Sequence, residues 1–186
     1  MENQRSILLR YFTVFNLEQC DGIESPEAVP VIHRLEQCES IVRLMPTPPR
    51  VEQDAQACYR PSVDTVGMPA RSAFVSAEEY YSTFFHELTH STGHPSRLAR
   101  DKIMEHHPFG SEDYSKEELV AEMGAAMLCG AAGIESRTLN NSAAYLQNWI
   151  SRLKSDSRLV VSAASQAQKA AHFILGKTAA EMEPDP

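Results

Sequence analysis

The sequence lacks long hydrophobic runs, and this absence bears on where the protein works. No apolar run approaches the roughly 20 residues that a helix needs to cross a bilayer. The first ten residues, Met1 to Arg10, mix charged and polar side chains and lack the long apolar core of a signal peptide. These two absences predict a cytoplasmic protein.

Positive charge is also scarce. The chain has 17 Lys and Arg residues against 25 Asp and Glu residues, which gives a net charge of -8 at pH 7. Binding nucleic acid through bulk electrostatics needs clustered basic side chains, so this balance argues against it. Arg97, Arg100 and Lys102 lie close together in the sequence and leave room for a local basic patch.

Paired cysteines are missing as well. The four cysteines are widely spaced and form no Cys-x-x-Cys pair, which favours free thiols in a reducing compartment over a disulfide framework. The length of 186 residues, with 42% apolar and 23% charged side chains, fits one domain with a sizeable core. We expect that domain to span residues 1–180, followed by an acidic tail over residues 181–186.

The pattern along the chain predicts an α+β protein, with a small β-sheet first and a helical C-terminal half. Proline on both sides of the strand over residues 64–68 suits an edge strand or a hairpin, and an edge strand can pair with an extended peptide. The expected strands cover residues 7–17, 57–59 and 64–68, with a turn at Asp21-Gly22. The expected helices cover about residues 25–45, 76–92, 115–129, 141–154 and 158–175, and the helices from Ser76 and Ser115 each open with a capping box.

The most specific stretch is His86-Glu87-Leu88-Thr89-His90, which lies in the later turns of the helix opened at Ser76. Histidines at i and i+4 project from one face of a helix and can bind one metal ion. Zinc fits such a site, with two nitrogen ligands, a third ligand from elsewhere and an open position for water. Glu87 is then placed to act as general base toward the zinc-bound water.

The third ligand has several candidates. The three-histidine extension of this motif is excluded, because Gly93 is present but Ser96 stands where the last histidine is needed. Glu118 and Glu122 form an acidic i, i+4 pair on the next helix, and Glu117 is a third candidate. The pair resembles the gluzincin arrangement, although that pattern has Asp at the second position. The resemblance implies that Glu118 binds zinc and that Glu122 orients a ligating histidine, with Glu122 as the alternative ligand.

Hydrolysis also needs a group that stabilises the tetrahedral oxyanion. Tyr145 and His94 are candidates by residue type. A structural role is at least as well supported for both, since Tyr145 lies on the apolar face of an expected helix and His94 follows a helix C-terminus.

Two motifs resemble a known family over nearly the whole chain. The stretch from Tyr80 to Leu98 is similar to the zincin-like metallopeptidase domain of ArdC-type antirestriction proteins and of related polyvalent proteins of plasmids and phages. The stretch from Lys116 to Ala126 resembles the second motif of that family, and residues 141–156 resemble its later helix. Residues 10–20 resemble its junction between domains, so we expect residues 1–20 to be the end of an N-terminal single-stranded-DNA-binding domain that is otherwise missing.

The resemblance implies a zincin-like fold and a zinc-dependent peptidase domain of a mobile-element protein. It implies a protein or peptide substrate, for instance a host defence protein, and no membrane. Two other functions stay open at this point. One is a metal-containing module that blocks a defence protein without cleaving it, and the other is a factor associated with single-stranded DNA, which the net charge disfavours.

Overall fold

The computed structural model describes residues 12–13, 15, 19–23, 31–100, 112–134 and 157–177. Within these ranges no helix is both long enough and apolar enough to cross a membrane. The helices are α1 (Val31–Leu44), α2 (Ala77–Ser91), α3 (Glu112–Ala132) and α5 (Ser157–Ile174), and the strands are β1 (Arg50–Gln53), β2 (Cys58–Arg60) and β3 (Thr65–Met68).

The three strands form one mixed sheet with the order β1-β3-β2. β2 and β3 pair antiparallel, with Tyr59 opposite Val66, so the predicted hairpin is confirmed. β1 was not predicted, and it pairs parallel to β3 with Val51 opposite Val66. The strand over residues 64–68 is therefore the centre of the sheet, and its prediction as an edge is wrong. The flanking prolines lie outside the paired residues of β3, so its backbone remains able to pair on both sides.

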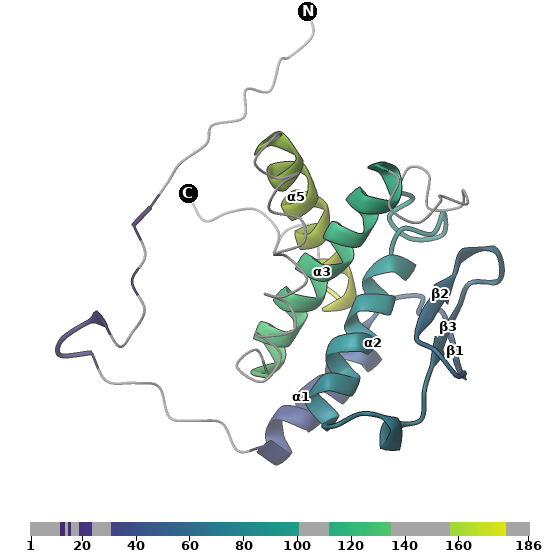
Figure 1. The fold of residues 1–186 in the computed structure, drawn as a ribbon, viewed down its shortest axis with the longest axis horizontal. Coiled ribbons are helices and arrows are strands. Elements are labelled where there is room, and N and C mark those ends of the chain that lie inside the picture. Colours follow the sequence, from purple (N-terminus) through teal and green to yellow (C-terminus); the bar gives the residue numbers. More distant parts are fainter. Residues whose placement is uncertain are drawn as a thin grey trace, which may run out of the picture.

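α2 is the central element of the fold. Figure 1 shows α2 between the sheet on one side and α3 on the other, with α5 packed against the far side of α3. Phe85 and Leu88 of α2 are 0% and 1% exposed and lie in the largest cluster of buried apolar residues, which also draws on α1, β3, α3 and α5. A helix buried on two sides needs apolar residues around much of its circumference, and the pairs Tyr80-Tyr81 and Phe84-Phe85 supply them.

The helical second half differs from expectation at the ends of α3. The helix begins at Glu112 and ends at Ala132, so it does not begin at Ser115 or end at Cys129. Acidic residues at the first two positions favour the earlier start, because they complement the positive N-terminal end of the helix dipole. Gly130 is helical, whereas Gly133 has a positive φ of 69° and follows the last helical residue, as glycine commonly does.

Other expectations have mixed outcomes. α1, α5, the turn at Asp21-Gly22 and the free state of all four cysteines are confirmed. A strand was expected over residues 7–17. At Phe12 and Phe15, which the structure describes, there is no strand, and the two side chains are 79% and 68% exposed. Residues 24–30 and 141–154, where a helix start and a whole helix were expected, lie outside the described residues.

A buried arginine fixes the end of α2 to the sheet. The Arg97 side chain is 1% exposed and forms an ion pair with Asp64, just before β3. Its Nε donates to the carbonyl oxygen of Ser91 at 2.7 Å, and Nη1 donates to that of Thr47 at 3.0 Å. This residue is therefore part of the fold and is not available for a surface basic patch.

Candidate metal centre

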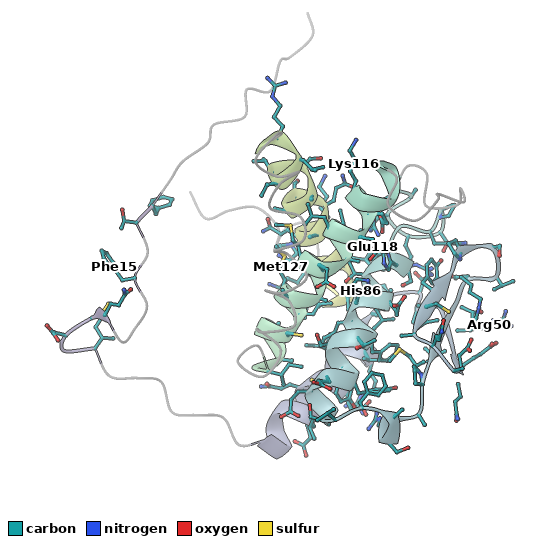
Figure 2. All side chains as sticks on the ribbon, viewed as in Figure 1. Phe15, Arg50, His86, Lys116, Glu118 and Met127 are labelled. Carbon is teal, nitrogen blue, oxygen red and sulfur yellow. The ribbon has the colours of Figure 1, made fainter. Side chains whose placement is uncertain are left out.

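The sequence at the start of α2 explains why its two histidines share a face. The Ser76 side chain caps the helix by accepting a hydrogen bond from the Glu79 backbone N–H at 3.1 Å, as the capping box predicts. The helix then runs unbroken to Ser91. His86 and His90 are consequently one turn apart and both point toward α3, and Figure 2 shows Glu118 on α3 facing His86 on α2.

Three ligand atoms converge between α2 and α3. Nε2 of His86 and Nε2 of His90 lie 3.1 Å apart. The Glu118 carboxylate lies 3.6 Å from the first and 3.4 Å from the second. A tetrahedral ion with bonds of about 2.0–2.1 Å separates its ligand atoms by roughly 3.3 Å, so this triangle has the size that zinc requires.

The outer nitrogen of each histidine faces another carboxylate. Glu122 Oε1 lies 3.3 Å from Nδ1 of His86, and Glu117 Oε1 lies 3.2 Å from Nδ1 of His90. When both Nδ1 atoms donate to these carboxylates, both neutral imidazoles present a lone pair at Nε2. Two Nε2 atoms at 3.1 Å need either a proton or a metal cation between them, and with both Nδ1 protons held by the carboxylates the donor set fits a metal ion.

The electrostatics of the cluster also favour a cation. Burial lowers the pKa of His86, but the neighbouring carboxylates of Glu118 and Glu122 outweigh it and raise this pKa to about 10. The pKa of His90 rises for the same reason, with Glu117 and Glu118 overcoming burial. Burial raises the pKa of Glu118, yet its contacts with the two histidines bring it below its usual range. Positive charge is thus stabilised at this point between the helices.

Glu87 lies one residue round the helix from His86 and is 8% exposed. Its negative charge contributes, after burial, to raising the pKa of Cys58 at the start of β2, and it also contributes to raising the pKa of His86. Among the described residues no hydrogen bond to this carboxylate is recorded. A buried carboxylate beside the histidines is chemically suited to act as a general base.

Sequence patterns did not predict the contacts that Glu117 and Arg100 make in the structure. Glu117 was a third-ranked ligand candidate, but it faces the outer nitrogen of His90 instead of joining the triangle. Arg100 was considered for a basic patch, yet its side chain is 7% exposed and forms an ion pair with Glu117. The sequence left room for a local basic patch of three residues, but Arg97 and Arg100 form ion pairs inside the fold. Lys102 lies outside the described residues.

Of the two suggested oxyanion stabilisers, His94 lies within the described residues and is not joined to this cluster. His94 lies beyond the C-terminus of α2, where its Nδ1 is 2.7 Å from Ser96 Oγ. Within the described ranges no contact of His94 with the three converging side chains is recorded. Tyr145 lies outside the described residues.

A glycine on α3 allows the two helices to approach closely enough for the triangle to form. A Cβ atom added at Gly124 would lie 2.6 Å from Thr89 Cγ2 and 2.8 Å from Thr89 Oγ1. Thr89 is 0% exposed, and its Oγ1 donates to the carbonyl oxygen of Phe85 at 2.7 Å, so it has little room to move. The contact lies in the same seam between α2 and α3 as the ligand triangle.

We therefore expect Gly124→Ala to lower the free energy of unfolding by about 1–3 kcal/mol, the usual cost of overpacking a core. Metal affinity should fall as well, because Glu118 would be held farther from the histidines. Urea unfolding and metal titration measure the two effects.

Gly130→Ala is the matched control, since a Cβ there meets nothing within 4 Å. It should raise stability by about 0.5–1 kcal/mol through helix propensity. Equal stability of the two variants would contradict the close approach at Gly124.

Comparisons with known proteins identify the family of the chain. A family model described as a zincin-like metallopeptidase matches residues 36–166. Two Escherichia coli proteins, each named DNA primase TraC, are 41% and 38% identical over 89% of this chain, which spans 15% and 11% of their lengths. An uncharacterized protein, y4eC, of Sinorhizobium fredii is 35% identical over 93% of this chain and 56% of its own length.

Two solved structures are also similar to this chain. Crystal structures of the antirestriction protein ArdC from the R388 plasmid, one Mn(II)-bound and one metal-free, are 35% identical to this chain, with TM-scores of 0.58 and 0.57. The matches cover 88% and 86% of this chain, and 60% and 57% of ArdC. These matches confirm the resemblance to ArdC-type proteins and the α+β, zincin-like fold. The family model covers well over half of the sequence, and the chain belongs to the zincin-like metallopeptidase family.

Proposed function

We propose that this chain is a zinc-dependent peptidase domain that works within an antirestriction-type protein of a mobile element. The observation that supports it best is the convergence of His86 Nε2, His90 Nε2 and the Glu118 carboxylate at 3.1–3.6 Å. Two imidazoles and one carboxylate with tetrahedral spacing suit zinc better than an all-oxygen octahedral metal. The Mn(II) in the ArdC crystal structure makes manganese the main competitor. We retain residues 1–180 as the proposed limits of the domain.

The residues of this chain would divide the work of hydrolysis. A bound zinc ion supplies Lewis acidity and lowers the pKa of a coordinated water to about 7. His86, His90 and Glu118 would hold the ion, and Glu122 would orient His86 through Nδ1. Glu87 would take the proton of the attacking water and deliver it to the leaving amine, since its carboxylate is buried and directly follows His86 on α2.

A non-catalytic module is the second candidate function. The names of the relatives favour it, because antirestriction protein and DNA primase both describe work on or around DNA and neither describes peptide cleavage. In that case the metal would stabilise the fold without taking part in a reaction, and the protein would bind and block a host defence protein. A factor that associates with single-stranded DNA is a weaker form of this candidate, given the net charge of -8.

Metal removal tests the proposal. The purified chain should contain one zinc ion per molecule by elemental analysis and should cleave members of a random peptide library. Chelation should abolish cleavage, zinc should restore it, and manganese should restore it less well. A chain that is loaded with metal and folded but cleaves nothing in the library would support the blocking module instead.

A further inference from the structure

Arg100 fills the corner between the C-terminal end of α2 and the first half of α3. Its Nη2 donates to the carbonyl oxygen of Thr89 at 2.9 Å and to that of His90 at 3.3 Å. Its Nη1 donates to the hydroxyl of Thr92. Both carbonyls also accept from the backbone N–H groups of Thr92 and Gly93, at 3.2 and 2.9 Å. The guanidinium therefore adds a second, charged donor at the negative dipole end of the helix.

The same guanidinium also binds the carboxylate of Glu117 on α3. Nε donates to Oε2 at 3.0 Å and Nη2 donates to Oε1, which makes the contact bidentate. Glu117 Oε1 in turn lies 3.2 Å from Nδ1 of His90. Arg100 therefore touches the backbone of His90 directly and its ring through Glu117.

The two histidines differ in this respect. Nδ1 of His86 faces Glu122 at 3.3 Å, and within the part of the chain that the structure describes no arginine contact with Glu122 is recorded. His90 is thus held by a carboxylate that an arginine fixes and compensates, whereas the described residues supply no such arginine to the carboxylate that faces His86.

We propose that Arg100 and Glu117 form a positioning pair that fixes the ring of His90 and thereby sets the metal affinity of the site. The inference rests on the proposed function, because it requires a metal at His86, His90 and Glu118. Glu117 keeps the Nδ1 proton on His90, which leaves the Nε2 lone pair directed at the ion. Arg100 holds Glu117 in place and keeps its charge from drawing the His90 ring away from the ion.

Arg97 provides a matched control for Arg100. Both are buried arginines that pair with a carboxylate and donate to a backbone carbonyl near the end of α2, but the partner of Arg97 is Asp64, which contacts no candidate ligand. A purely structural arginine should therefore behave alike at both positions.

The test compares Arg100→Met, Arg100→Lys and Arg97→Met in the whole chain. Thermal unfolding without metal reports the structural cost. Zinc affinity, measured by competition with a coloured chelator where every variant is folded, reports positioning. The visible absorption spectrum of the Co(II)-loaded protein reports the geometry around the ion.

We expect Arg100→Met to weaken zinc binding by about 10–100-fold and to change the Co(II) spectrum. Arg100→Lys should recover part of the affinity, and Arg97→Met should lower the melting temperature while leaving affinity and spectrum unchanged. If Arg100→Met does not fold, Glu117→Gln replaces it, with the same expected direction.

Two results would overturn the inference in distinguishable ways. If Arg100→Met, or Glu117→Gln in its place, lowers thermal stability but leaves zinc affinity and the Co(II) spectrum as in the unaltered chain, the pair is structural and the proposed function stands. If the unaltered chain binds no metal at all, the proposed function fails and the positioning role fails with it.

Discussion

Glu87→Gln is expected to leave the metal in place and to lower the rate of peptide cleavage by about 10²–10⁴-fold, the usual contribution of a general base. Glutamine has the shape of glutamate but cannot take a proton at neutral pH. His86, His90 and Glu118 are untouched by this change. Metal content, zinc affinity and cleavage rate are measured on the same sample.

Glu78→Gln is the control for that experiment. Glu78 lies in the first turn of the same helix, about two turns before His86, and is also 8% exposed. The Glu78→Gln variant should cleave peptides at the rate of the unaltered chain. Full cleavage by Glu87→Gln with zinc bound would remove Glu87 as the base and, with it, the proposed peptidase mechanism.

Glu118→Ala and Glu122→Ala are expected to separate the ligand from the residue that orients a ligand. Glu118 faces the Nε2 atoms of both histidines, so its loss should abolish stoichiometric zinc binding, as His86→Ala should. Glu122 faces Nδ1 of His86, and its loss should weaken zinc binding by about 10–100-fold. Chelator competition measures both affinities.

The relative loss of zinc affinity in these two variants identifies the third ligand. Both residues lie on α3 with side chains 14% and 17% exposed, so differences in burial do not explain a difference in affinity. Stronger loss in Glu122→Ala than in Glu118→Ala would make Glu122 the third ligand and would contradict the assignment argued above.

Local signals in the sequence predicted the elements that depend on neighbouring residues. Ser76 and Glu79 predicted the start of α2, and the spacing of His86 and His90 predicted that they share one face of the helix. The acidic pair on the next helix was visible because Glu118 and Glu122 are one turn apart. Each of these signals acts over no more than four residues, where helix geometry alone decides which side chains are adjacent.

Features that depend on distant residues were not predicted. β1 pairs with β3 across more than ten residues, and its four residues are all exposed, so no apolar alternation marks them. Ser115 has the pattern of a capping box, but Glu112 and Asp113 extend the helix beyond it. Glu117 and Arg100 meet only because α2 and α3 pack together, and a charged residue in a loop carries no local sign of burial.

The division of the candidate ligands between two helices links metal supply to the survival of the protein. His86 and His90 lie on α2 and Glu118 lies on α3, so an ion held by all three joins segments that are separate in an unfolded chain. Metal binding to the folded form alone adds about 2.7 kcal/mol of stability at a free metal concentration 100 times Kd. A change of that size alters the unfolded fraction about a hundredfold, and proteases in the cell act on that fraction. Cellular zinc would then govern how long each molecule lasts, in addition to whether it is active.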